Sequence, residues 1–232
     1  MLNTYKEIVF QMKKITILGF AMIISFMLFL VPVSQTLAET EIPKAKLPIL
    51  TTSAGQSPDV TTINIVLEEA GITYDYCDVP SVEIVNAGVG LAGKESGPGF
   101  HVEVYTDKEK FPEGTPYKTV IIAIGASLKG MGASGLTVES EVSRLKKIID
   151  NCKKKKMFII AVHVGGTSKR GAPGSDNERM IDAAAPFADY LIVTTDGNKD
   201  GRFDTIAKEK GIPLTLIEYA LDLVDIFKHV FK

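Results

Sequence analysis

Short apolar runs alternate with segments of helical periodicity from residue 47 to the end of the chain. The uninterrupted runs have the length and composition of strands that are buried on both faces of a parallel sheet. Between them, apolar residues recur at helical spacing, as at Val60, Ile63, Val66 and Leu67. We expect strands at Leu47–Ser53, Ile72–Cys77, Lys118–Ile124, Met157–Val162, Tyr190–Thr194 and Leu214–Ile217.

This alternation predicts a Rossmann-like α/β domain with three layers. Strands that are joined through helices run parallel, with right-handed crossovers and helices on both faces of the sheet. We expect a parallel sheet of five to six strands in a single domain over residues 47–232. Residues 78–117 interrupt the pattern, and Val82–Val85 and His101–Tyr105 are expected to pair as a hairpin around the glycine-rich stretch Gly88–Gly99.

The first 38 residues form a different kind of segment. Lys13 and Lys14 precede an apolar run from Ile15 to Val33, and small residues end the segment at Ala38. This order is typical of a secretory signal. The run is also long enough to span a bilayer, so an uncleaved N-terminal anchor is the alternative. We expect an exported protein that meets the membrane only through this segment, with residues 39–46 as a linker.

Composition argues against a nucleic-acid partner. The formal net charge is -2 for the whole chain, and residues 1–38 contribute three lysines and one acid, so the remainder carries -2 - 2 = -4. Binding to nucleic acid depends on neutralising phosphates with basic side chains, which a weakly acidic domain does not favour. The two cysteines, Cys77 and Cys152, are expected at opposite edges of the sheet and therefore as unpaired thiols.

Glycines concentrate in the loops that follow the predicted parallel strands. These loops all leave the same edge of such a sheet, where ligands of α/β domains bind. Exposed backbone N–H groups and helix N-termini at that edge favour an anion. We therefore predict a crevice for a small anionic molecule. Its candidate residues are Ser53, Gly55, Gln56, Ser57, Ser127, Lys129, His163, Gly165, Gly166, Lys169, Arg170, Asp196, Asn198 and Asp200.

Two of these loops suggest particular chemistry. Ser57-Pro58-Asp59 has the order of a helix start, so Ser57 is expected to cap a helix and to donate to an anion. Arg170 is expected to clamp the anion through its planar guanidinium. His163 ends a strand and is the candidate acid or base of an alternative function, a hydrolase or transferase. That enzyme would need His163 within hydrogen-bond reach of Ser53, Ser127 or Asp196.

Three further sequence patterns are weaker indications of function or structure. Gly88–Gly93 has the letters of a dinucleotide fingerprint, but Gly97-Pro98-Gly99 follows where a helix should open, and the sequence identifies no cofactor. Asp196–Gly201 has the spacing of a calcium loop but lacks its final carboxylate, because Ala207 stands there. A calcium-assisted interaction module remains an alternative, although we assign no metal ligand. Ser175–Glu178 is expected to form a capping box.

Three blocks resemble a family of exported bacterial proteins with a domain of unknown function, DUF6305. They are Leu47–Ser57, Ile124–Gly130 and Gly197–Gly201. The resemblance would cover nearly all of the chain after the N-terminal segment. It supports the domain boundary and the choice of loops, and it implies no activity and no catalytic residue.

Overall fold

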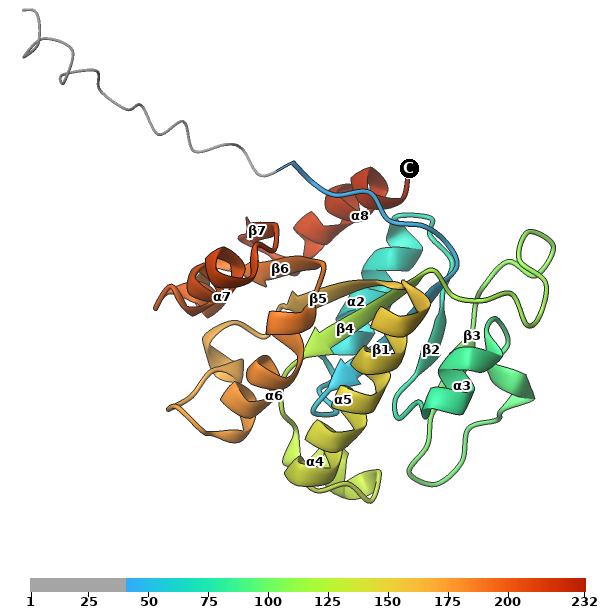
Figure 1. Cartoon of the computed structure of the whole chain (residues 1–232), viewed down its shortest axis with the longest axis horizontal. Helices are drawn as coiled ribbons and strands as arrows, with labels where there is room; N and C mark the ends of the chain where they lie inside the picture. Colours follow the sequence, from blue (N-terminus) through green and yellow to red (C-terminus); the bar gives the residue numbers. More distant parts are fainter. Residues whose placement is uncertain (1–40) are drawn as a thin grey trace, which may run out of the picture. The chain divides into compact units, whose positions relative to one another are not determined.

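The computed structural model describes residues 41–232, so the predicted signal or anchor over residues 1–38 lies outside the described residues. A seven-stranded sheet forms the middle layer, in the order β3-β2-β1-β4-β5-β6-β7 (Figure 1). Its strands are β1 Ile49–Ala54, β2 Asp75–Cys77, β3 Val102–Val104, β4 Thr119–Ile124, β5 Phe158–His163, β6 Tyr190–Thr194 and β7 Leu214–Ile217.

Six of the strands are parallel, which confirms the predicted Rossmann-like core. The seventh, β3, runs antiparallel to β2 at one end of the sheet, with Tyr76 opposite Glu103, so the sheet is mixed. The helices are α2 Asp59–Glu69, α3 Val82–Ala87, α4 Leu128–Ala133, α5 Val138–Lys155, α6 Asp176–Ala184, α7 Arg202–Lys210 and α8 Leu223–Phe231. Short 3-10 turns lie between them at Leu91–Gly93 (η1), Gly166–Lys169 (η2), Ala185–Phe187 (η3), Thr195–Asn198 (η4) and Ala220–Asp222 (η5).

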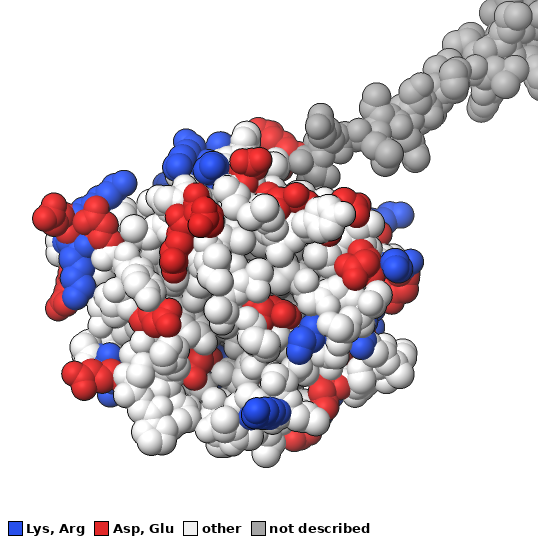
Figure 2. Space-filling view, turned by 180° about the vertical axis from the view of Figure 1, so that it is seen from behind, with Lys and Arg blue, Asp and Glu red and all other residues white. Residues whose placement is uncertain are grey.

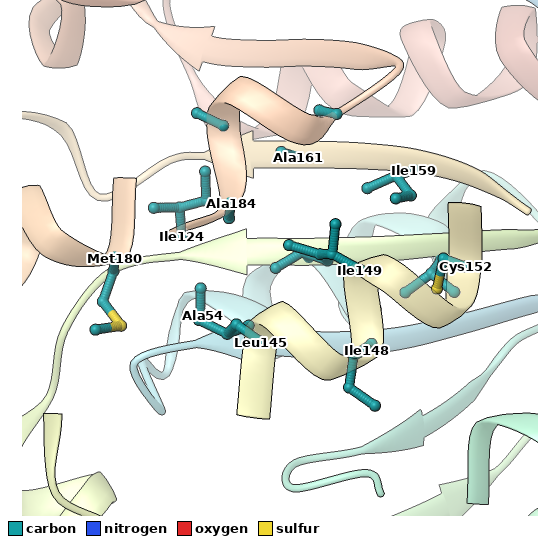
Figure 3. Packing of buried hydrophobic residues seen from close by; sticks show 14 of the residues in the cluster. Ala54, Ile124, Leu145, Ile148, Ile149, Cys152, Ile159, Ala161, Met180 and Ala184 are labelled. Atoms are coloured by element: carbon teal, nitrogen blue, oxygen red, sulfur yellow. The ribbon is translucent and has the colours of Figure 1, made fainter. Parts of the chain in front are cut away.

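Alternate residues of the central strands face two separate cores. In β4, Val120, Ile122 and Ile124 belong to the core under α5 and α6, which Figure 3 shows from close by. Ile121 and Ala123 belong to the core under α2 and α8. Residues of β4 are fully buried along its length, so the strand reads as a continuous apolar run.

The insertion over residues 78–117 differs from the expected hairpin. Val82–Ala87 is the helix α3, capped by Ser81, whose hydroxyl accepts from the Ile84 N–H. Val102–Val104 pairs with β2 instead of with that segment. The prediction was wrong because V-E-I-V alternates like a strand, whereas packing of Val85 into the core selects a helix.

Residues 42–46, which were expected to be part of a linker, lie along the domain. The Ala45 N–H donates to Val230 O of α8, and the Thr119 hydroxyl donates to Lys46 O. Within residues 41–232, no helix combines the length and the apolar composition that crossing a bilayer requires.

Candidate functional site

The strand order creates a switch point between β1 and β4. The chain leaves β1 toward α2 on one face of the sheet and leaves β4 toward α4 and α5 on the other face. The two loops therefore diverge where the strands end, and open α/β sheets bind ligands at such places. Figure 1 shows the loops after β1, β4, β5 and β6 at this same edge, which we call the carboxyl edge.

Backbone and side-chain bonds join the four predicted loops in sequence along the carboxyl edge. The Ser127 N–H donates to Gly55 O at 2.7 Å, which ties the loop after β4 to the loop after β1. Lys169 Nζ donates to Ala126 O at 2.9 Å from the loop after β5. The Thr167 N–H donates to Asp196 of the loop after β6 at 3.2 Å. The predicted residues therefore lie along one edge, as the topology requires.

A buried ion pair holds the first of these loops. Glu141 is fully buried and accepts from the Gly55 N–H at 2.8 Å and from Arg144 Nε at 2.8 Å. Arg144 also donates to Ser53 O at 2.7 Å. The loop after β1 is thereby fixed by two residues of α5 that sequence reasoning missed. The sequence did contain a signal that Glu141 is buried, because it falls at helical spacing with Leu145 and Cys152 on the buried face of α5.

Asp59 points a carboxylate oxygen into the switch point. Its Oδ2 is buried and has no hydrogen-bond partner among the described residues. A Cβ atom on Gly125 would lie 3.0 Å from this oxygen and 3.0 Å from Ser57 Oγ, so the two polar atoms meet over the Gly125 backbone. The Ser57 hydroxyl accepts from the Asp59 N–H at 3.3 Å. The N-cap position of α2 is Pro58, one residue later than predicted, and no side chain caps the helix.

The aliphatic part of the Lys169 side chain lies close to Asp59 Oδ2 at the switch point. A Cβ atom on Gly165 would lie 2.1 Å from Lys169 Cγ and 2.7 Å from Asp59 Oδ2. The glycines after β4 and β5 therefore leave room for one lysine and one carboxylate, with Lys169 half-buried above them. Lys129 is exposed at the same edge, and half-buried Ser127 caps α4 by accepting from the Gly130 N–H.

Arg170 does not serve as the free clamp that the sequence suggested. It donates to Glu178 at 2.8 Å and to Asp200 at 2.7 Å, and it also donates to Gly197 O. These bonds hold the pKa of Arg170 above its usual range, first through Asp200, and they hold the pKa of Asp200 at about 2. Because these acceptors engage its guanidinium, Arg170 links two loops and a helix instead of offering itself to a ligand.

The same ion pair removes the expected capping box at Ser175. Glu178 is 1% exposed and accepts from Arg170, from Arg202 at 3.0 Å and from the Gly171 N–H at 3.1 Å. Ser175 makes no side-chain cap, and its hydroxyl has no partner in the described part of the chain. A buried carboxylate between two guanidinium groups gains more than a helix cap supplies.

His163 is buried at the end of β5, where it contacts a backbone carbonyl and an aromatic ring. Its Nε2 lies 3.2 Å from Lys169 O, and its ring lies against Phe203 with centroids 5.1 Å apart. Burial lowers the pKa of His163, so the neutral ring is favoured. No hydrogen bond joins it to Ser53, Ser127 or Asp196 in residues 41–232, so the geometry required for the enzyme alternative is not met.

The Asp196–Gly201 loop directs its oxygen atoms at protein donors. Asn198 accepts from the Phe203 N–H at 2.8 Å and donates to Asp204 at 2.7 Å. Asp196 is bonded to the loop after β5, and a Cβ on Gly166 would lie 2.3 Å from its carboxylate, which explains the glycine. Across residues 41–232, no three His, Cys, Asp or Glu side chains are grouped so as to hold a metal ion.

Asp78 is a second residue that sequence reasoning missed. It follows β2, and its Oδ1 accepts from the N–H groups of Val79 and His101. Its backbone carbonyl accepts from Gln56 Nε2 at 2.9 Å, so the insertion reaches the switch point. Burial raises the pKa of Asp78. An acidic residue directly after a short strand was the available signal.

Fold and site together define an open α/β domain whose loops converge at the carboxyl edge of a largely parallel sheet. A family model described as "Domain of unknown function (DUF6305)" matches residues 46–231, and the chain belongs to this family. The predicted resemblance is thereby confirmed.

Other comparisons add little. No curated protein matches this chain. Among solved structures, it is similar to a GDSL-like lipase from Bacteroides thetaiotaomicron VPI-5482, with 12% identity and a TM-score of 0.29. That match covers 72% of this chain and 66% of the other chain, and at this TM-score we draw nothing from it.

Proposed function

We propose that the protein binds a small polar ligand at the carboxyl edge, centred on the switch point between β1 and β4. One observation carries the proposal. Of the nine buried side-chain polar atoms without a partner in residues 41–232, three belong to residues around the switch point: Ser53, Asp59 and Arg144. Four more belong to residues in or beside the elements at β5 and β6: His163, Ser175, Thr194 and Arg202. Buried polar groups are normally hydrogen-bonded, so this concentration indicates a place where a ligand or ordered water completes the bonding.

The ligand chemistry follows from the groups that remain available. Lys129 and Lys169 lie in α4 and in η2, which follow β4 and β5, and neither forms an ion pair within the described residues, so they favour an anionic group. Asp59 Oδ2 needs a donor, which an adjacent hydroxyl or amine would supply. We infer a small molecule that carries an anionic group beside a hydrogen-bond donor, as hydroxy acids and amino acids do.

Binding is favoured over catalysis on geometric grounds. Nucleophilic catalysis needs a hydroxyl, a base and an orienting group in mutual contact. Here His163 contacts a backbone carbonyl and a phenyl ring, and Ser57 uses its hydroxyl to accept from a backbone N–H. These contacts stabilise the loops and assemble no such set.

A thermal-shift screen with amino acids, hydroxy acids and inorganic phosphate tests the proposal. A ligand at 100 times its Kd stabilises the folded state by about 2.7 kcal/mol, which the screen detects as a raised Tm. Calorimetric titration of the best ligand should then show weaker binding to Asp59→Asn and Lys169→Met. The control, Lys208→Met, removes an exposed lysine of α7. The proposal is wrong if no compound raises the Tm, or if both site variants bind as well as the control.

We also propose that the domain acts outside the cytoplasm. The proposal rests on Lys13-Lys14, the apolar run Ile15–Val33 and Ala38 in the sequence. Cell fractionation with an antibody against the C-terminus should find the protein in the exported or membrane fraction. Full-length soluble protein in the cytoplasm would contradict it.

A further inference from the structure

A basic cavity lies at the opposite edge of the sheet, where β4 and β5 begin. Its volume is about 550 Å³, and five lysines line it: Lys44, Lys46, Lys118, Lys155 and Lys156. We call it the lysine cavity. A strand of six residues separates this edge from the switch point by about 17–20 Å, so the lysine cavity is distinct from the site proposed above.

The five lysines come together through the fold. Lys44 and Lys46 precede β1, Lys118 precedes β4, and Lys155 and Lys156 end α5. Within residues 41–232, none of the five forms an ion pair with Asp or Glu. Lys44 donates to His229 O, and no Asp or Glu lines the cavity. Five exposed lysines therefore line one hollow, and the nearest acidic residue at its margin is Asp189, which lines the adjoining hollow together with Lys156 and is paired with Lys153.

This cluster of five lysines differs from the rest of the chain in its distribution of charge. The formal net charge is -2, and on the face seen in Figure 2 acidic and basic side chains are interspersed. The C-terminal end of α5 favours nearby cations through its dipole, which accounts for Lys155. It accounts for neither Lys46 nor Lys118, which belong to other segments. Like charges repel, so the arrangement is favourable when an anion is bound between them.

Lys156 supplies a second, independent observation. It caps α5 in the left-handed conformation, with φ +56°, where glycine is the usual residue. A lysine at this position strains the backbone and adds an ammonium group at the cavity. Asn86 adds a neutral donor, because its Oδ1 accepts from Asn151 and its amide N–H groups donate to no acceptor within residues 41–232.

The cavity has an apolar floor below these polar groups. Val85 and Met157 are buried, and Phe158 is half-buried beside them. Ammonium groups donate charge-assisted hydrogen bonds to phosphate oxygens, and a hollow of about 550 Å³ has room for a phosphate group together with the molecule that carries it. We propose that the lysine cavity binds a phosphate-bearing anion, either a free phosphate compound or the headgroup of an anionic lipid.

Two probes separate these sources: pyrophosphate in solution, measured by calorimetric titration, and vesicles of phosphatidylglycerol compared with vesicles of phosphatidylcholine. The neutral vesicles account for any association through the apolar run Ile15–Val33 of the full chain. The test variant is Lys118→Gln/Lys155→Gln. The control is Lys199→Gln/Lys208→Gln, which removes the same charge from two exposed lysines outside the cavity.

We expect the test variant to weaken binding of pyrophosphate or of anionic vesicles at least about tenfold, while the control retains it. Lys156→Gly should also weaken binding without lowering the Tm, because glycine adopts positive φ without strain. Binding of pyrophosphate alone identifies a free anion, and binding of the anionic vesicles identifies a lipid. The proposal is overturned if the unaltered protein binds neither probe, or if the test variant binds the probe as well as the control variant does, which for pyrophosphate would indicate the carboxyl edge instead.

Discussion

Arg170→Ala should destabilise the protein strongly, although Arg170 is in a surface loop. Its side chain is 12% exposed and bonds to Glu178, which is 1% exposed. Breaking a buried ion pair costs about 3–5 kcal/mol, because it leaves a buried charge without its partner. Glu178 keeps Arg202 at 3.0 Å and the Gly171 N–H at 3.1 Å, which places the loss at the lower end. Asp200 is 58% exposed and adds little. We therefore expect a loss of about 3 kcal/mol.

Urea denaturation gives the free energy of unfolding by linear extrapolation and measures this loss directly. Arg179→Ala is the matched control. Arg179 is 34% exposed and pairs with Glu139, which is 72% exposed, so its removal should cost under about 1 kcal/mol. The double variant Arg170→Ala/Glu178→Ala should recover part of the loss, since no buried charge is then left alone. A loss below about 1 kcal/mol for Arg170→Ala, or no recovery in the double variant, would refute this reasoning.

Three further variants, with Gly71→Ala as a control for one of them, probe other contacts. Burial lowers the pKa of His163, so the unfolded chain binds its proton more readily, and the unfolding free energy should fall as the pH drops below about 6.5. His163→Gln should reduce that slope in denaturation curves between pH 5 and 8, and an unchanged slope would contradict the assignment. Gly55→Ala puts a Cβ 2.6 Å from Gly125 O at φ +93° and should lower stability by about 1–3 kcal/mol in urea. Gly71→Ala, which meets nothing within 4 Å, should cost less. Asp75→Ala should speed amide hydrogen exchange in residues 78–117 more than elsewhere, and a uniform change would count against a local role.

The parallel strands could be predicted because burial on both faces leaves a plain sequence signal. β4, β5 and β6 are uninterrupted apolar runs, and the structure contains all of them. The elements of the insertion could not be predicted in the same way. β3 has three half-buried residues, and α3 has six residues with an alternating pattern, so tertiary contacts decide both.

The position of the candidate site followed from topology, whereas its internal bonds did not. Parallel strands bring their following loops to one edge whatever residues these loops contain. Whether Arg170 meets a ligand or a carboxylate depends on Glu178 and Asp200, which reach it only after folding. Glu141 was hidden for a related reason, because an acidic residue on an apolar stripe is explained only by its partner Arg144.

Asp75 has a consequence for how much of the insertion can vary. Its carboxylate is fully buried in β2 and accepts from the Gly90 N–H at 2.8 Å, the Thr106 N–H at 3.1 Å and the Tyr117 hydroxyl at 2.6 Å. One side chain thereby accepts hydrogen bonds from three separate parts of the insertion that follows it. Changing the length of the stretches between these three donors should be tolerated, whereas removing any one of the donors leaves a buried carboxyl group short of a hydrogen bond. The three donors therefore tie the insertion to the sheet through one buried carboxylate, and the chain between them is held less directly.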